Sequence, residues 1–165
     1  MMSEPATVSI HVVMGWYTSD YVDRKMHGRG KMTFFSGSSY DGDWKDDNKH
    51  GYGKRTYPSG RVYEGDWKDG ACSGKGKCTY PEGTVYEGGW ANDERNGCGK
   101  ITWFAGVYEG EWKDGNRNGC GKSVWHNGNV YEGEYKDGNK HGRGVKTWAD
   151  GRVQDGQWKN GKFIA

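Results

Sequence analysis

Aromatic and polar residues alternate in short segments that recur along the chain. The segment Tyr63-Glu64-Gly65-Asp66-Trp67 has a ring at each end, a glycine at its centre and a carboxylate on either side of that glycine. Successive side chains of a β-strand point to opposite faces, so the rings and the glycine would share one face and the carboxylates the other. The alternation therefore predicts a strand with an aromatic side and a charged side.

This five-residue pattern returns at a nearly constant interval. Its good copies begin at Tyr40, Tyr63, Tyr86, Tyr108 and Tyr131, and altered copies begin at Tyr17 and Gln154. The interval is 23 residues, except for one step of 22 between Tyr86 and Tyr108. We expect the missing residue in the loop around Phe104-Ala105-Gly106. Self-similarity at a fixed period is typical of repeat architectures.

A second signature follows ten residues after each anchor tyrosine. It has the form Gly-x-Gly, as in His50-Gly51-Tyr52-Gly53, and an aromatic residue follows four positions later. These aromatic residues are Phe34, Tyr57, Tyr80, Trp103, Trp125 and Trp148. Turn dipeptides such as Asp69-Gly70 and Asn127-Gly128 separate the segments. Each repeat is therefore predicted as strand, turn, strand, turn.

These residues resemble the MORN (membrane occupation and recognition nexus) repeat. The resemblance covers about seven repeats over residues 16–163, with departures at Ser19, Tyr21 and Gln154 in the end copies. It implies an all-β fold, an elongated, twisted, single-layer antiparallel sheet with one β-hairpin per repeat. Residues 1–15 would form an N-terminal extension, in which the alternation at Val8, Ile10 and Val12 predicts an added edge strand.

The second strand of each hairpin is expected to continue the two faces of the first. Gly74, Gly76 and Cys78 would join the rings, and Lys75 and Lys77 would face the carboxylates. Asp41 and Asp43 with Lys54, and Glu109 and Glu111 with Lys122, follow the same plan. Opposite charges on neighbouring strands contribute about 0.2–1 kcal/mol for each pair.

The amino-acid composition supports a β-fold whose core consists of aromatic side chains. The chain of 165 residues contains 30 glycines and no leucine, which argues against a helical bundle. Its 24 basic and 22 acidic residues give a net charge of +2, which argues against nucleic-acid binding by bulk electrostatics. No stretch approaches the roughly 20 apolar residues of a membrane span.

No motif indicates catalysis, a cofactor or a metal. Gly115 to Ser123 resembles a phosphate-binding loop, but its first glycine is one residue too early and no helix is predicted after it. The paired carboxylates recur in every repeat, whereas catalysis usually breaks symmetry. We expect free thiols at all four cysteines, with Cys72 in a hairpin loop and about 10 Å between Cys98 and Cys120. An intermolecular metal site on the His27, His50 or cysteine rows stays open as an alternative.

The aromatic face is the predicted docking surface. A one-layer sheet has no second layer to cover its rings, so part of their surface should stay exposed, and the family resemblance implies a groove that receives a partner segment, often helical. The variable position two residues past each Gly-x-Gly would tune selectivity, as at Cys78 and Ile101. The predicted groove residues are Tyr40, Trp44, Tyr63, Trp67, Tyr86, Trp90, Tyr108, Trp112, Tyr131, Tyr135, Ile101 and Cys78.

The sequence thus predicts a non-catalytic scaffold or adaptor that binds a protein segment. A second hypothesis is a peripheral membrane module that binds acidic phospholipids through a row of lysines along one edge. These are Lys45, Lys68, Lys113, Lys136 and Lys159. A third is self-association, including a homodimer through open sheet ends, as in a cytoskeletal component. With no secretory signal apparent before Met14, we expect a cytoplasmic protein, associated with cytoskeleton or membrane as the resemblance implies.

Overall fold

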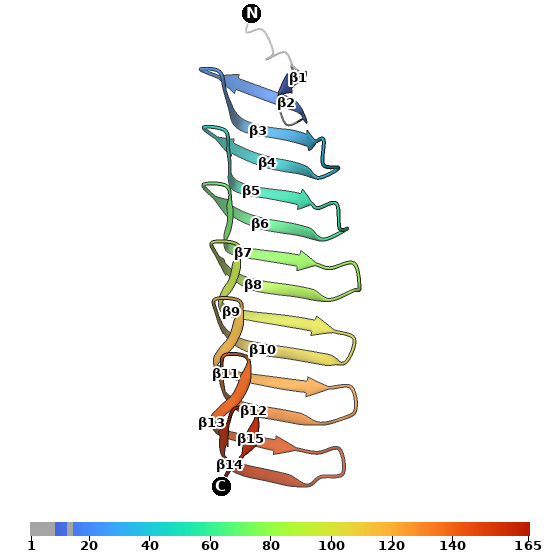
Figure 1. The fold of residues 1–165 in the computed structure, drawn as a ribbon, viewed down its shortest axis with the longest axis vertical. Helices are drawn as coiled ribbons and strands as arrows, with labels where there is room; N and C mark the ends of the chain where they lie inside the picture. Colours follow the sequence, from blue (N-terminus) through green and yellow to red (C-terminus); the bar gives the residue numbers. More distant parts are fainter. Residues whose placement is uncertain (1–8, 13–14) are drawn as a thin grey trace, which may run out of the picture. The chain divides into compact units, whose positions relative to one another are not determined.

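The computed structural model describes residues 9–12 and 15–165, and this part of the chain consists of strands, turns and loops. It contains no helix, and hence none long and apolar enough to span a membrane. The chain divides into two compact units, Met1–Pro81 and Glu82–Ala165. Both are antiparallel sheets in which each strand pairs with the next along the chain (Figure 1). The predicted all-β hairpin array is confirmed.

The first unit contains seven described strands. They are β1 (Ser9–Val12), β2 (Gly15–Val22), β3 (Lys25–Phe34), β4 (Ser39–Lys45), β5 (Asn48–Thr56), β6 (Val62–Lys68) and β7 (Ala71–Thr79). Strand β1 pairs with β2, with Ser9 opposite Thr18 and Val12 opposite Gly15. The predicted edge strand is therefore present over these four residues, whereas Val8 lies outside the described residues.

The second unit repeats the same plan. Its strands are β8 (Val85–Ala91), β9 (Glu94–Trp103), β10 (Gly106–Lys113), β11 (Asn116–Trp125), β12 (Val130–Lys136), β13 (Asn139–Thr147), β14 (Val153–Lys159) and β15 (Lys162–Phe163). Strands β9 and β10 are joined by the two-residue turn Phe104-Ala105, and Trp103 pairs directly with Gly106. Elsewhere four or five residues join the equivalent strands, as at residues 35–38 and 57–61. The shortened loop is therefore where the 22-residue step predicts it.

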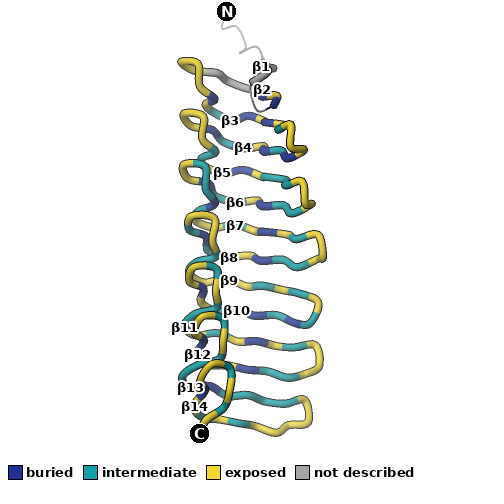
Figure 2. The backbone as a smooth tube through the Cα atoms, in the orientation of Figure 1, coloured by how far each residue is buried: buried dark blue, intermediate teal, exposed yellow. Residues whose placement is uncertain are grey.

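Two-residue turns close the other ends of the hairpins. A type I′ turn needs positive φ at both central residues, which Asp, Asn and Gly tolerate best. Asp69 and Gly70 have φ angles of 49° and 88°, and Asp114 and Gly115 have 48° and 77°. Several of these turns also bond to the preceding hairpin, as where the Gly70 N–H donates to the Lys49 carbonyl over 2.9 Å. Buried residues lie along the strand centres, and both sets of turns are largely exposed (Figure 2).

A β-bulge next to the type I′ turn changes the predicted register. Gly65 pairs with Gly76, but Trp67 pairs with Cys72, so three residues of β7 stand opposite the single residue Asp66. The Asp66 carboxylate accepts the freed N–H of Lys75 over 2.8 Å. Two predictions are corrected as a result. Cys72 is a buried strand residue and not a loop residue, and the second carboxylate of the repeat binds the bulge instead of a lysine.

The second unit uses the same bulge. Gly110 pairs with Gly121 and Trp112 with Arg117, and the Glu111 carboxylate accepts the Cys120 N–H over 2.8 Å. A bulge inserts residues into only one strand, and it re-aims the side chains that follow. In both units it therefore decides which residue of the second strand lies beside the buried tryptophan.

The core of each unit is a chain of rings packed edge to face. Trp67 contacts Tyr63 of its own repeat and Tyr40 of the preceding one, with ring centroids 5.0 and 5.3 Å apart. Its indole N–H donates to the Gly53 carbonyl over 3.0 Å. The second unit repeats these contacts, as where Tyr86 and Trp112 lie 5.2 Å apart. Such pairs contribute about 0.5–1.5 kcal/mol beyond the area that they bury.

The Gly-x-Gly signature makes room for the tyrosine rings. A methyl group on Gly53 or Gly121 would overlap the ring of Tyr40 or Tyr108, respectively. The Tyr108 hydroxyl donates to the Glu111 carbonyl over 2.9 Å, which satisfies its polar end inside the core. Burial raises the pKa of the Tyr131 hydroxyl to about 12 and raises the pKa of Tyr108 further. These hydroxyls consequently stay protonated to a higher pH than an exposed tyrosine would.

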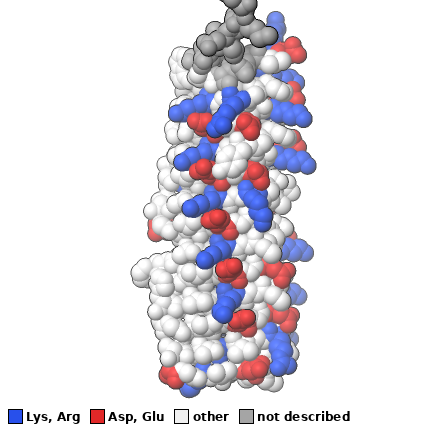
Figure 3. All heavy atoms as spheres, turned by 180° about the vertical axis from the view of Figure 1, so that it is seen from behind, with Lys and Arg blue, Asp and Glu red and all other residues white. Residues whose placement is uncertain are grey.

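The opposite face carries a ladder of charges. Lys54 stands between Asp41 and Glu64 on the flanking strands, and its ammonium lies 3.6 Å from the Glu64 carboxylate. In the second unit Lys122 lies 3.0 Å from Glu132. Both ion pairs join one hairpin to the next. Figure 3 shows lysine and arginine alternating with aspartate and glutamate along this side. The face is therefore nearly neutral.

Candidate functional site

The predicted groove residues are placed in the core. Eleven of the twelve are buried, and each of the five anchor tyrosines among them is 0% exposed. The expectation that part of this ring surface stays open is wrong for these residues. Ile101 alone is partly exposed. A partner on this face would therefore contact Ile101 and the side chains that lie over the buried rings. We call the surface that they form the ring face.

In the second unit the rings are covered by three cations. The Arg95 guanidinium lies 4.4 Å from the Trp112 ring, and the Arg117 guanidinium lies 5.1 Å from the Tyr135 ring. The Lys140 ammonium lies 4.8 Å from the Trp158 ring. Cations over aromatic faces are attracted by the ring quadrupole. We call Arg95, Arg117 and Lys140 the cation row.

Each member of the cation row has the same place in its repeat. It is the second residue after the type I′ turn, and the bulge sets it beside the buried ring at the end of the first strand, as Arg117 beside Trp112. A hydrogen bond from Arg117 Nη2 to the Gly138 carbonyl over 2.8 Å fixes one guanidinium. Sequence reasoning missed this row. The basic residue two positions after Asp114-Gly115 and Asp137-Gly138 was the available signal.

The cation row has no carboxylate partner. Among the described residues, Arg95, Arg117 and Lys140 form no ion pair, and neither does Lys146 nearby. Burial lowers the pKa of Lys140, and the neighbouring charges of Lys146 and Arg117 lower it further. Like charges that are kept together and partly desolvated favour an anionic partner.

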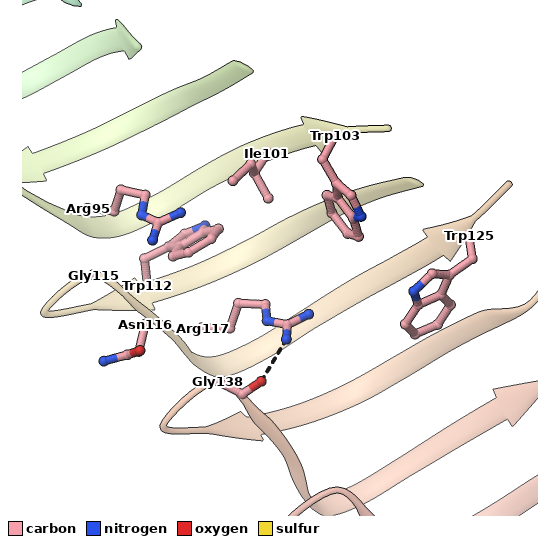
Figure 4. A pocket seen from close by; sticks show the side chains of 9 residues that line it. All are labelled: Arg95, Ile101, Trp103, Trp112, Gly115, Asn116, Arg117, Trp125 and Gly138. Atoms are coloured by element: carbon pink, nitrogen blue, oxygen red, sulfur yellow. Dashed lines mark hydrogen bonds between the residues drawn. The ribbon is translucent and has the colours of Figure 1, made fainter. Parts of the chain in front are cut away.

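Trp103 and Trp125 form the other wall of a groove. They lie at the ends of β9 and β11, where the recurring aromatic residue of the repeat falls, and both are half-buried. Between this tryptophan pair and the guanidiniums of Arg95 and Arg117 lies a hollow of about 480 Å³. Ile101 and Trp112 also line it. Figure 4 shows both tryptophans and both arginines around the same space, with the Arg117–Gly138 bond drawn.

The comparison with known families agrees with the geometry. The family model of the MORN repeat matches residues 17–39, 40–60, 63–85, 86–106, 108–130, 131–151 and 155–163. The chain belongs to the MORN-repeat family. The seven matches confirm the predicted number of repeats, and the first six begin at the anchor tyrosines. No individually curated protein matches the chain significantly.

The lysine edge of the MORN repeats lies apart from the groove. Lys45, Lys68, Lys113, Lys136 and Lys159 are all exposed at the strand ends before the type I′ turns. Each is followed by an aspartate or asparagine, so acidic side chains are interspersed with the lysines. In the first unit, Lys25 on the neighbouring strand lies 3.8 Å from the Asp46 carboxylate. This edge consequently carries both signs of charge.

The cysteines fall into two environments. Cys72 and Cys78 are buried beside the rings, whereas Cys98 and Cys120 are exposed, and all four are free thiols. Among the described residues, no three His, Cys, Asp or Glu side chains come together as a metal site would need. The stretch from Gly115 to Lys122 forms a hairpin turn and a bulge, without the helix of a phosphate-binding loop.

Proposed function

We propose that this MORN-repeat protein is a non-catalytic scaffold that docks a segment of a partner protein on the ring face of its second unit. One observation carries the proposal, the open groove between a half-buried tryptophan pair and two arginines that form no ion pair with any described residue. Tryptophan and arginine are the side chains most enriched among residues that dominate binding energy at protein interfaces. MORN-repeat proteins are generally non-catalytic scaffolds, which supports the same reading.

A library of displayed peptides selected against the full chain tests this proposal. Enriched peptides should lose binding to a Trp103→Ala/Trp125→Ala variant, whose folding is first checked by circular dichroism. They should keep binding to Lys100→Ala, which removes an exposed charge from the opposite face of the same unit. Peptides that bind the tryptophan variant as tightly as the parent would place docking elsewhere.

The lipid-binding and self-association hypotheses stay predictions. No feature of the lysine edge favours a lipid headgroup over solvent, because carboxylates and amides of the turns stand among its ammonium groups. The expected cytoplasmic location and the association with cytoskeleton or membrane likewise stay predictions.

A further inference from the structure

We infer that the partner segment is an acidic amphipathic α-helix whose carboxylates recur every seven residues and face the cation row. The inference rests on the proposed function, and it adds the chemistry and periodicity of the ligand. Its starting point is that three cations of the second unit stand one repeat apart on the ring face and form no ion pair within the part of the chain that the structure describes.

The spacing of the cation row fits two turns of a helix. Equivalent residues of adjacent repeats are separated by two strands, or about 9.6 Å at the usual strand spacing of about 4.8 Å. Seven helical residues advance about 10.5 Å and return almost to the same side of the helix. Carboxylates seven residues apart would therefore meet Arg95, Arg117 and Lys140 in turn. The small mismatch lies within the reach of these long side chains.

An extended strand does not fit the same spacing. Three residues of a strand advance about 10 Å, but successive third residues point to opposite faces, so alternate carboxylates would miss the cation row. A polyproline helix has a suitable rise per turn of about 9.3 Å, and the width of the groove argues against it.

The groove is wide enough for a helix. Its walls come from strand positions that pair with Trp112 and Gly106 on β10, because Arg117 is opposite Trp112 and Trp125 is opposite Gly106. Six residues of strand separate these positions, or about 20 Å between the backbones of the two walls. The side chains of Arg117 and Trp125 project into this span (Figure 4). An α-helix with its side chains is about 10–12 Å across, less than the distance between the two backbones.

The two walls contact neighbouring strips on one side of that helix. Carboxylates would face the cation row, and apolar residues three and four positions later would face Trp103, Trp125 and Ile101. Positions three, four and seven residues apart share one side of a helix, so one amphipathic segment satisfies both walls. Charge complementarity would then fix the register of the helix, and the apolar contacts would supply most of the affinity.

Synthetic peptides test the inference on the full chain. One helix-forming peptide carries three glutamates seven residues apart, with leucines three and four positions after each. A second peptide of identical composition has its glutamates five residues apart, which spreads them around the helix. Measured by fluorescence anisotropy, the first peptide should bind at least about tenfold more tightly. Equal affinities would overturn the proposed register.

Charge exchange makes the test independent of folding defects. Arg117→Gln should weaken the seven-residue peptide about tenfold and leave the other peptide unchanged, and the opposite-face control Lys100→Gln should change neither. An Arg95→Glu/Arg117→Glu variant should reject the glutamate peptide and accept its lysine counterpart. Binding of the lysine peptide also shows that the variant is folded.

The outcomes separate this inference from the proposed function. If both peptides bind equally and both are lost with Trp103→Ala/Trp125→Ala, the groove binds peptides and the seven-residue register is wrong. If neither peptide binds while phosphatidylserine vesicles bind only when Arg95 and Arg117 are intact, the helical ligand is overturned in favour of a lipid headgroup. If neither peptide binds and the chain self-associates through the same arginines, a second copy takes the place of the helix.

Discussion

The two units share one backbone plan and differ in what covers the rings. In the first unit the place of the cation row is taken by Met26, Lys49 and Cys72, of which Met26 and Cys72 are buried. There the guanidiniums of Arg55 and Arg61 lie 4.4 and 3.9 Å from the ring of Tyr57. In the second unit three cations stand over the rings, and the tryptophan pair borders an open hollow.

This difference separates the residues that build the repeat from those that adapt it. In the five good repeats the anchor tyrosine, the glycines and the ring that ends the first strand, a tryptophan or Tyr135, make the same contacts in both units. The residues two positions after the turn and two positions after Gly-x-Gly change from repeat to repeat. In the first unit such a residue, Arg55, covers the ring of its own Tyr57, and in the second unit Arg95 and Arg117 face a space that a partner would fill.

The largest effect is expected from a methyl group placed under a tyrosine ring. Gly53→Ala in the first unit and Gly121→Ala in the second should each lower the free energy of unfolding by about 3 kcal/mol, because the tyrosine ring cannot move away in a packed core. Urea unfolding followed by tryptophan fluorescence measures both. The control Gly97→Ala has open space and a φ of 75°, so it should cost only about 1 kcal/mol. Unequal costs at Gly53 and Gly121 would break the claim of a shared scaffold.

Alkaline pH should destabilise both units through the same rings. The pKa of Tyr131 is about 12 in the folded protein against an ordinary value of 10.0, so the folded state binds more protons than the unfolded state between these values. The contribution of the Tyr131 hydroxyl to the free energy of unfolding is therefore fully present below pH 10 and is lost as the pH rises toward 12. Thermal unfolding midpoints measured across this range should fall steadily. Tyr131→Phe should reduce the slope, and a slope unchanged by that variant would contradict the assignment.

Binding should depend on the cation row of the second unit only. Arg117→Ala is expected to weaken the seven-residue glutamate peptide about tenfold, or about 1.4 kcal/mol. Lys49→Ala, at the matching position of the first unit, should leave its affinity unchanged. Isothermal titration calorimetry with the full chain gives both values. A loss of affinity with Lys49→Ala as large as that with Arg117→Ala would show that the two ring faces are functionally alike.

The smallest effect concerns the charged faces. Asp66→Ala and Glu111→Ala each leave one bulge N–H without its carboxylate and should cost about 1 kcal/mol. Lys54→Ala removes a half-exposed ion pair and should cost less than about 0.5 kcal/mol. Chemical denaturation of the three variants ranks them. A larger loss with Lys54→Ala would mean that ion pairs matter more to the scaffold than the bulges do.

Much of the fold was predictable because the same strand and turn signatures recur in each repeat. The Tyr-x-Gly-x-Trp alternation predicted the strands and their buried faces, and Asp69-Gly70 predicted a tight turn. The bulge opposite Asp66 was not predicted, because Ser73-Gly74-Lys75 fits a regular strand equally well. That single irregularity moved Cys72 into the core, and its counterpart in the second unit set Arg117 beside Trp112.

The candidate site was half predicted. Trp103 and Trp125 were recognised as a recurring aromatic position, and Ile101 as a variable one, but the groove was assigned to anchor rings such as Tyr63 that are fully buried. The exposure of the anchor rings was overestimated, because long side chains from the neighbouring strand lie over them even in a single-layer sheet. Arg95 covers Trp112 in this way.

The amino-acid sequence alone specifies the repeat, the number of hairpins, the turns and the aromatic core, because these depend on neighbours within one or two strands. Which side chains lie over the rings follows only from the three-dimensional arrangement of the strands. That choice depends on the register across each bulge and on contacts between residues more than 20 positions apart, such as Arg117 and Gly138. Adjacent repeats together place a cation over a tryptophan ring and build the walls of the groove. No single repeat specifies either arrangement.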